Sequence, residues 1–171
     1  RNAWFGTVFV IIDTRKIFAM KTLQTNILLV EDDASLSTVL ADYLRSKGYT
    51  VETASNGREA WELILIKHYD LIISDIMMPK MNGYELLKLI RAQYSHLPVI
   101  MLSAKTDRDD IIAAYDLGCD DYMTKPFSMD ILICKMEAIL RRFRLINESA
   151  GSLNLPILFW GKYIIQGRSI R

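Results

Sequence analysis

The sequence predicts an α/β protein built on a doubly wound, five-stranded parallel sheet. From Asn26 onward, short runs of β-branched and aliphatic residues alternate with longer stretches in which apolar residues recur at helical spacing. This alternation is typical of parallel strands joined by crossover helices. Right-handed crossovers place helices on both faces of such a sheet, and its ligands bind beyond the carboxyl ends of the strands. We therefore expect the functional site at that edge.

Each strand and helix of this plan has its own signal. The expected strands cover residues 27–30, 50–54, 71–74, 98–102 and 121–124. The second run is the most polar and is expected near an edge, whereas the unbroken apolar run at 71–74 predicts a buried strand. Apolar stripes predict a helix after each strand, and the residues that form them are Leu36, Val39, Leu40, Tyr43 and Leu44; Ala60, Trp61, Ile64 and Leu65; Leu86, Leu87 and Ile90; Ile111, Ile112 and Tyr115; and Leu132, Met136, Ile139 and Leu140.

The composition limits the possible functions. With 171 residues, of which 51% are hydrophobic, the chain is long enough for one compact domain with tails. Its 21 basic and 20 acidic residues leave a formal charge of +1, so no overall basic field indicates binding to nucleic acid or to an anionic membrane. Cys119 and Cys134 have neither the number nor the spacing of a disulfide framework or a zinc site. We interpret them as reduced core residues of a cytosolic protein.

Three segments are predicted along the chain. Residues 1–23 are interpreted as an N-terminal extension, because Met20 stands just before the first predicted unit as a natural start; an added strand or a flexible tail are the alternatives. The apolar run at 4–12 is too short to span a membrane, which takes about 20 residues. Residues 24–144 form the α/β domain, and residues 145–171 contain a polar linker followed by a β-like aromatic stretch.

Acidic, hydroxyl and basic side chains stand at the ends of four predicted strands. They are Glu31-Asp32-Asp33 after the first, Asp75 after the third, Ser103 after the fourth, and Thr124-Lys125-Pro126 at the fifth. Clustered carboxylates repel one another unless a cation or hydrogen bonds compensate. Mg²⁺ prefers oxygen ligands, and a lysine and a hydroxyl at the same edge would complete a receptacle for a phosphoryl group. Asp33 is interpreted separately as a helix cap, because Asp is common near helix starts.

Asp75 is the candidate reactive residue of this group. Carboxylates form acyl phosphates, and phosphoryl transfer passes through a loose transition state, so positioning and charge neutralisation supply most of the assistance. We therefore interpret Asp75 as a nucleophile that accepts a phosphoryl group with help from a metal ion and Lys125.

Four separated motifs resemble, in order and spacing, the receiver domain of bacterial two-component response regulators, over roughly residues 24–144. They are "ILLVEDD", "DLIISDIMMPKMNGYEL", "PVIMLSAK" and "GCDDYMTKPF". The resemblance implies a (βα)5 flavodoxin-like fold with strand order 2-1-3-4-5. It also implies that Asp75 accepts the phosphoryl group, and that Mg²⁺ is held by Asp32, Asp75 and the carbonyl of Met77, with Glu31 acting mainly through water.

The same resemblance implies roles for the residues around Asp75. Lys125 would contact the phosphoryl group, and the peptide bond before Pro126 is typically cis in the family. Ser103 would swing toward the phosphoryl group and Tyr122 would follow it inward, which alters the face formed by the fourth helix, fifth strand and fifth helix. The donor would be a separate histidine kinase in the cytoplasm. The domain would assist its own phosphorylation and dephosphorylation without being an enzyme in the ordinary sense.

The end of the predicted domain resembles the OmpR-type subclass, whose members dimerise through that same face and carry a winged-helix DNA-binding domain. Asp121 and Lys135 keep one charge pair of that dimer, whereas Ile111 and Ile131 stand where the subclass has a basic residue and a Glu. An apolar contact is therefore expected there on phosphorylation, unless both isoleucines pack within one subunit. Residues 145–171 resemble a linker and the opening strands of the winged helix, so DNA binding is expected only through a full-length effector domain.

Other functions compete with this interpretation. A stand-alone receiver would act through protein partners and not through DNA. A phosphatase of the haloacid-dehalogenase type would need a second Asp two residues after Asp75, where Met77 stands. A flavodoxin-like flavin binder would need a phosphate-cradling loop after the first strand, where this chain places three acids, and a glycine-rich nucleotide loop is absent from the sequence.

Overall fold

Parallel strands and crossover helices alternate through residues 24–146, the part of the chain that this computed structural model describes. The strands are β1 (Asn26–Val30), β2 (Thr50–Ala54), β3 (Leu71–Asp75), β4 (Val99–Ser103) and β5 (Asp121–Thr124). The helices are α2 (Ala34–Ser46), α3 (Gly57–Ile66), α4 (Gly83–Gln93), α5 (Arg108–Asp116) and a last helix at 129–146. The predicted strands are therefore confirmed, with ends that shift by at most one residue.

The strands form one parallel sheet in the predicted order, β2-β1-β3-β4-β5. The crossovers on either side of β1 and β3 run in opposite directions, which makes this pair of strands the topological switch point of the sheet. Val30 of β1 lies opposite Ser74 of β3. The next residues along each strand, Glu31 and Asp75, consequently reach the carboxyl edge side by side.

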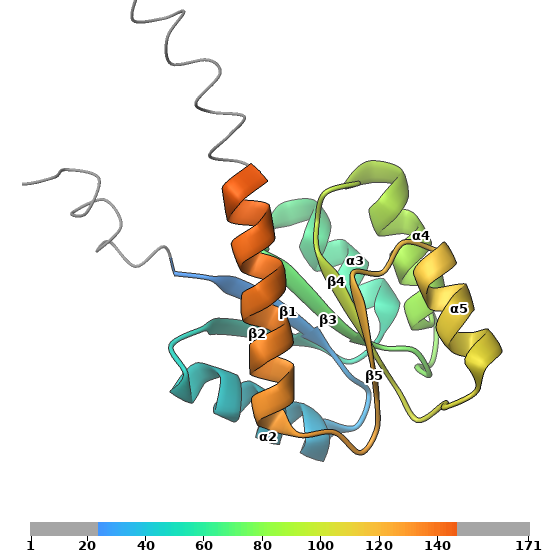
Figure 1. Ribbon diagram of the computed structural model, residues 1–171, viewed down its shortest axis with the longest axis horizontal. Helices are drawn as coiled ribbons and strands as arrows, with labels where there is room; N and C mark the ends of the chain where they lie inside the picture. Colours follow the sequence, from blue (N-terminus) through green and yellow to red (C-terminus); the bar gives the residue numbers. More distant parts are fainter. Residues whose placement is uncertain (1–23, 147–171) are drawn as a thin grey trace, which may run out of the picture.

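Helices cover both faces of the sheet, as Figure 1 shows. The α2 helix and the last helix pack on one face, where they bury Ile27 and Leu29 of β1. The α3, α4 and α5 helices pack on the other face, against Leu28 and Val30. Because successive strand residues point to opposite faces, the unbroken apolar run of β1 supplies both cores. None of the helices within residues 24–146 is long and apolar enough to cross a lipid bilayer.

Polar residues fix where two helices begin at the carboxyl edge. The Oδ1 atom of Asp33 accepts hydrogen bonds from the backbone N–H groups of Ser35 (2.9 Å) and Leu36 (3.1 Å), so Asp33 caps α2 as predicted. Asn82 and Glu85 form a reciprocal capping box at the start of α4. The loops after β1 and β3 therefore end at defined residues, which limits how far the acids before them can move.

Two residues of the predicted apolar stripes, Val39 and Leu65, do not face the sheet, so this part of the prediction is wrong. Val39 and Leu65 are 58% and 49% exposed. The α2 helix buries the small residues Ser37 and Ala41 together with its leucines. A helical residue is rotated by about 100° from its neighbour, so the burial of Ser37 and Ala41 turns Val39 toward solvent. Apolar character alone did not identify which side of these helices packs on the sheet.

The two cysteines differ in exposure, although both thiols are free. Cys119 is buried, and burial raises the pKa of its thiol to about 12, so it stays protonated at neutral pH. Cys134 is exposed on the last helix. The prediction that both are core residues is thus wrong for Cys134, because it lies half a helical turn from the buried residues Leu132 and Met136.

Gly83 brings the start of α4 against the end of β3. Its N–H donates a hydrogen bond to the carbonyl oxygen of Ile76 (2.9 Å), and a Cβ added here would collide with the carbonyl oxygen of Asp75. Glycine is required at this position by close approach of two backbones. Gly48 is a different case, because its φ is +92° and nothing lies within 4 Å of an added Cβ.

We expect Gly83→Ala to lower the free energy of unfolding by about 3 kcal/mol, since neither backbone can move away without shifting the end of β3. Gly48→Ala should lower it by only about 1 kcal/mol, the cost of a side chain at positive φ. Urea unfolding of both variants measures these losses. Equal losses would contradict the assignment of Gly83 as a site of close backbone approach.

Candidate functional site

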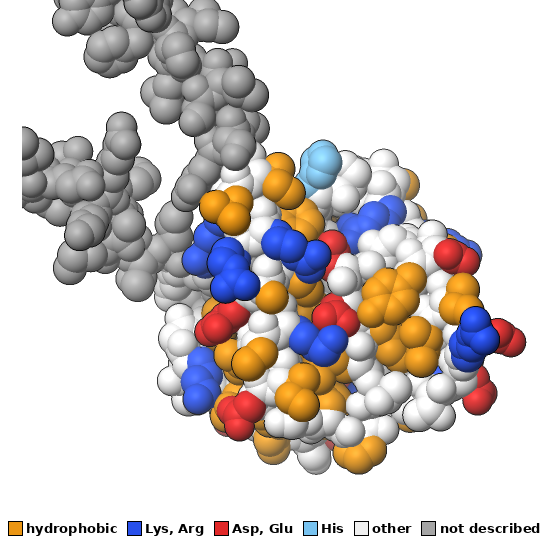
Figure 2. Space-filling model, viewed as in Figure 1, with side chains coloured by type: hydrophobic (Ala, Val, Ile, Leu, Met, Phe, Trp, Pro, Cys, Tyr) orange, Lys and Arg blue, Asp and Glu red, His pale blue; other side chains and the backbone are white. Residues whose placement is uncertain are grey.

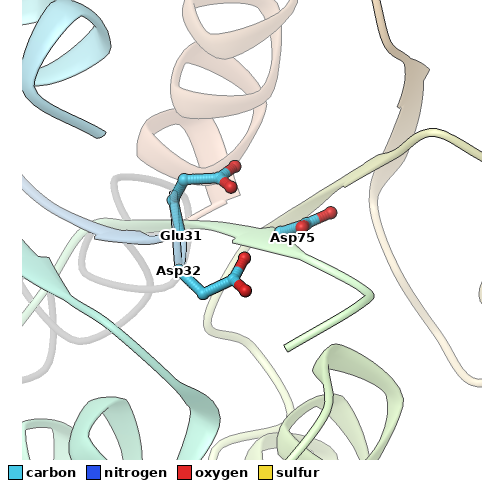
Figure 3. A group of neighbouring side chains, drawn as sticks. All are labelled: Glu31, Asp32 and Asp75. Carbon is cyan, nitrogen blue, oxygen red and sulfur yellow. The ribbon is translucent and has the colours of Figure 1, made fainter. Parts of the chain in front are cut away.

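Side chains from three strands meet at the carboxyl edge of the sheet. Glu31 and Asp32 follow β1, Asp75 ends β3, and Lys125 follows β5. Each of the three acids offers one oxygen, and these oxygens lie within 4.8 Å of one another. Figure 3 shows Glu31 and Asp32 at the end of β1, with their carboxylates beside Asp75. The fold therefore brings together residues that the sequence places more than forty positions apart.

Lys125 bridges two of the three acids. Its Nζ lies 2.7 Å from Oε2 of Glu31 and 3.3 Å from Oδ2 of Asp75, and its side chain is 20% exposed. The backbone N–H of Lys125 donates to the carbonyl oxygen of Ser103 (2.7 Å), which ties the lysine to the end of β4. The Lys125-Pro126 peptide bond is cis, as the resemblance implied.

The carboxylates are held in fixed orientations by backbone groups. Oδ1 of Asp75 accepts a hydrogen bond from the N–H of Ile76 (2.8 Å), while its Oδ2 faces Lys125. Oε1 of Glu31 accepts from the N–H of Asp33 (3.3 Å). Glu31 and Asp75 are 3% and 5% exposed, whereas Asp32 is exposed to solvent. The site thus combines two buried, oriented carboxylates with one that solvent can reach.

The charges in this site do not balance. Burial raises the pKa of Glu31, and the negative charge of Asp75 adds to that effect, against the opposing hydrogen bond from Lys125. Burial by itself would lower the pKa of Lys125, but its hydrogen bond to Glu31 and the charges of both acids outweigh burial and raise it. Lys125 therefore stays protonated at neutral pH, and one positive charge faces three acids.

The donor set fits a hard divalent cation. Carboxylate oxygens are preferred ligands of Mg²⁺, which also keeps several waters, and the exposed side of Asp32 leaves room for them. Met77 was expected to contribute its backbone carbonyl. It lies two residues after Asp75 and its side chain is 58% exposed, so the side chain is not part of the buried site. The role of the Met77 carbonyl remains a prediction.

Ser103 and Tyr122 lie on adjacent strands and are bound to the same loop residue. Ser103 is fully buried, and its Oγ accepts a hydrogen bond from the backbone N–H of Lys105 (3.0 Å). Tyr122 is 8% exposed, and its hydroxyl donates to the backbone carbonyl of Lys105 (3.0 Å). Tyr122 therefore occupies an inward position here. The sequence interpretation assigned no role to Lys105, although Lys105 ends the motif that contains Ser103, because its bonds depend on how the loop after β4 folds back.

The residues proposed for a dimer face lie on α5, β5 and the last helix. Ile131 is 53% exposed, whereas Ile111 is half-buried and packs against the core. Ile112 and Tyr115, whose apolar character helped to predict α5, are 43% and 47% exposed, because α5 buries only Ala114 completely. Figure 2 shows apolar side chains gathered over this side of the molecule, beside charged ones.

Asp121 and Lys135 pair with each other within one chain. Nζ of Lys135 lies 2.7 Å and 2.8 Å from the two carboxylate oxygens of Asp121. The complementary charges that were expected to meet across a dimer are therefore satisfied inside the monomer.

The fold and the site together define a class of protein. It is the class of open α/β domains whose binding site lies beyond the carboxyl ends of parallel strands. The family model of the response regulator receiver domain matches residues 27–137. The chain belongs to the response regulator receiver domain family. Receiver domains of this family belong to two-component signalling systems and bind Mg²⁺ at an acidic site.

Curated relatives agree with this assignment. The chain is 46% identical over 118 residues to the transcriptional regulatory protein RprY of Bacteroides fragilis, covering 69% of this chain and 50% of that protein. It is 40% identical over 132 residues to the alkaline phosphatase synthesis transcriptional regulatory protein PhoP of Bacillus subtilis, covering 77% of this chain and 55% of that protein. The chain thus spans about half the length of the curated relatives it matches.

Solved structures show the same fold. The receiver domain of the Francisella response regulator 1452 has a TM-score of 0.67 and 36% identity, covering 69% of this chain and 98% of that one. The chemotaxis response regulator CheY4 of Vibrio cholerae has a TM-score of 0.64 and 32% identity, covering 68% and 98%. The predictions of a flavodoxin-like receiver fold and of a response regulator receiver domain are confirmed, and the relatives of this chain include regulators of the OmpR type.

Millimolar MgCl₂ should raise the temperature of thermal unfolding, because a ligand that binds only the folded state stabilises it by about 2.7 kcal/mol at a hundred times its Kd. Asp32→Asn should lose most of this gain, since it removes an exposed ligand and leaves both ion pairs of Lys125 intact. Asp33→Asn is the control, because asparagine caps a helix as well as aspartate does. Equal gains in both variants, measured against NaCl of the same ionic strength, would contradict a site at Asp32.

Proposed function

We propose that the chain accepts a phosphoryl group from a histidine kinase on Asp75, with Mg²⁺ as cofactor, in the cytoplasm. The observation that carries this proposal is the position of Lys125 Nζ between Glu31 and Asp75, beside the third acid Asp32. A carboxylate with a fixed cation at one side and a metal-binding set of oxygens at the other has the surroundings that phosphoryl transfer needs. Glu31 and Asp75 both contact Lys125 and both belong to the acidic group, and Asp75 is the one that we assign as the nucleophile.

Transfer of the phosphoryl group forms one bond to phosphorus and breaks another. A carboxylate oxygen of Asp75 forms a bond to phosphorus while the bond between phosphorus and the kinase imidazole nitrogen breaks, and the bonding electron pair leaves with that nitrogen. Asp32, Asp75 and the carbonyl of Met77 would hold Mg²⁺ directly, and Glu31 through water. A Mg²⁺ ion bound by these residues would supply positive charge to compensate the phosphoryl oxygens. Lys125 supplies the same compensation from the other side without a change in its own protonation.

The product is a modified form of the protein, so the chain is not an enzyme in the ordinary sense. Asp75 is consumed when it is phosphorylated and is regenerated only by hydrolysis, which the same residues assist. The requirement for a second acid/base in a phosphatase of the haloacid-dehalogenase type is not met, because Met77 stands two residues after Asp75. A phosphoryl group that stays on the protein is consistent with a signalling role and not with repeated turnover of a substrate.

Phosphorylation would be transmitted through Ser103 and Tyr122. The bond that Ser103 accepts from Lys105 uses an oxygen lone pair, so the serine can still donate its hydroxyl hydrogen to a phosphoryl oxygen. Any resulting shift of the loop after β4 reaches Tyr122 through the carbonyl of Lys105. The face built from α5, β5 and the last helix then changes with the state of Asp75.

The output would be control of transcription through a C-terminal DNA-binding domain. RprY and PhoP are named transcriptional regulatory proteins, and both are about twice as long as the matched part of this chain. The boundaries 1–23, 24–144 and 145–171 stay predictions, because residues 1–23 and 147–171 lie outside the described part. A stand-alone receiver that acts on protein partners is the alternative.

Incubation with MgCl₂ and acetyl phosphate should add one phosphoryl group to the native chain. Asp75→Asn should gain none, because an amide of the same shape cannot attack phosphorus. Lys125→Met should retain the nucleophile but react at least about tenfold more slowly, since its compensating charge is gone. Intact-mass measurement over time follows all three proteins. A phosphate adduct of equal yield on Asp75→Asn would contradict the assignment of Asp75.

We also propose that the phosphorylated chain forms a homodimer through the face of Ile111, Asp121, Ile131 and Lys135. Ile131 is exposed although it is apolar, and Ile112 and Tyr115 are exposed on the same side of the molecule. An apolar contact would replace an ion pair of the subclass at little cost, because exposed ion pairs contribute only about 0 to 1 kcal/mol.

Ile131→Glu should weaken this dimer at least about tenfold, because burial of a carboxylate in an apolar contact is unfavourable. Val39→Glu introduces the same charge at a similarly exposed site on α2 and should leave the dimer unchanged. Light scattering of the acetyl-phosphate-treated proteins gives the masses. A dimer of unchanged strength in Ile131→Glu would exclude this face.

A further inference from the structure

Lys105 is bonded through three of its atoms, each to a different part of the molecule. Its backbone N–H donates to Oγ of Ser103 (3.0 Å), and its backbone carbonyl accepts from the hydroxyl of Tyr122 (3.0 Å). Its Nζ forms an ion pair with Oδ1 of Asp110 (2.9 Å) in the first turn of α5. The conformation of this one residue therefore determines where both the buried serine and the buried tyrosine find their partners.

The first turn of α5 has few other anchors. Asp107, the residue at its N-cap, makes no side-chain capping hydrogen bond, in contrast to Asp33 and Asn82 at α2 and α4. The turn is held instead from outside the helix, because the hydroxyl of Tyr84 on α4 donates to the backbone carbonyl of Asp110 (3.1 Å). Asp110 is thus fixed by its backbone to α4, and its carboxylate fixes Lys105.

We infer that Tyr84, Asp110 and Lys105 are positioning residues that hold the hydroxyls of Ser103 and Tyr122 in the orientation that receives a phosphoryl group on Asp75. The inference rests on the proposed function for its last step, whereas the anchoring of the loop does not depend on it. The chain of contacts runs from α4 through Tyr84 to Asp110, through the ion pair to Lys105, and from the backbone of Lys105 to Ser103.

The physical benefit is preorganisation. The N–H of Lys105 occupies one acceptor direction of Ser103 Oγ and so limits the rotation of the serine side chain, while the hydroxyl hydrogen stays available for a phosphoryl oxygen. A loop that is already ordered loses less conformational entropy when the anion binds. The Lys105 and Asp110 side chains are 40% and 25% exposed, so their ion pair is modest in strength and weakened by salt.

The first measurement is the exchange rate of the Lys105 amide hydrogen in the unphosphorylated protein. Asp110→Asn should speed exchange by about two- to fivefold at low ionic strength, the range expected for a partly exposed ion pair, and this difference should shrink in high salt. Asp109→Asn is the control: it removes the same charge from the same turn, and the Asp109 side chain makes no hydrogen bond or ion pair within residues 24–146. Tyr84→Phe should also speed exchange.

The second measurement is the affinity for beryllofluoride, a phosphoryl mimic, in the presence of MgCl₂. Asp110→Asn and Lys105→Met should bind it about two- to fivefold more weakly, whereas Lys105→Arg, which keeps the charge, and Asp109→Asn should bind it as the native chain does. Unchanged exchange and affinity in Asp110→Asn would overturn the inference. Faster exchange with unchanged affinity would overturn the positioning role and leave only a structural contact.

Failure of the proposed function would give a different pattern. A native chain that binds no beryllofluoride would refute phosphoryl acceptance at Asp75 and, with it, the positioning role. The exchange rates of Asp110→Asn and Asp109→Asn would then still decide whether the ion pair anchors the loop.

Discussion

Lys125 holds next to each other two carboxylates that would otherwise repel. Glu31 and Asp75 reach the carboxyl edge on adjacent strands because the register of β1 and β3 places them there, and both are nearly excluded from solvent. Without a cation, this arrangement would be costly, since buried like charges oppose each other in a medium of low dielectric constant. The ammonium group between them makes the apo site compatible with a folded protein. One lysine does not balance three acids, so the site keeps an excess of negative charge that favours the binding of a metal ion.

The lysine is effective only because the fold fixes its position. Its backbone is bonded to the end of β4, and the strand before it is paired along its length with β4. The ends of β1, β3, β4 and β5 are in this way held together. A movement of β5 would change the distances from Lys125 to Glu31 and Asp75. Gly83 adds a second constraint on the end of β3, because α4 approaches this strand there too closely for a side chain. The carboxylate of Asp75 therefore lies at the end of a firmly held strand, whereas the loop after β4 is irregular and is held by the contacts of Lys105.

The sequence was sufficient for the parts of the molecule that depend on periodicity and chain direction. Strands such as β1 and β3 have both faces buried, so their apolar runs are unbroken and easily found. Parallel strands end at one edge, so the acids, the serine and the lysine could be placed together without knowledge of any side-chain conformation. The orientation of Val39 and of Cys134 was missed, because apolar residues occur on more than one side of their helices and packing selects the side. The bonds from Lys105 to Ser103, Tyr122 and Asp110 could not be foreseen, since they depend on the conformation of an irregular loop.

The unequal exposure of the two cysteines has a practical consequence for experiments on this domain. Only the thiol of Cys134 is open to reagents in the folded state, because the thiol of Cys119 is both enclosed and protonated. Cys134 directly precedes Lys135 on the last helix. A fluorophore or spin label attached to the native chain would therefore settle at a single known point beside the Asp121–Lys135 pair, and would report on that surface without the introduction or removal of any residue.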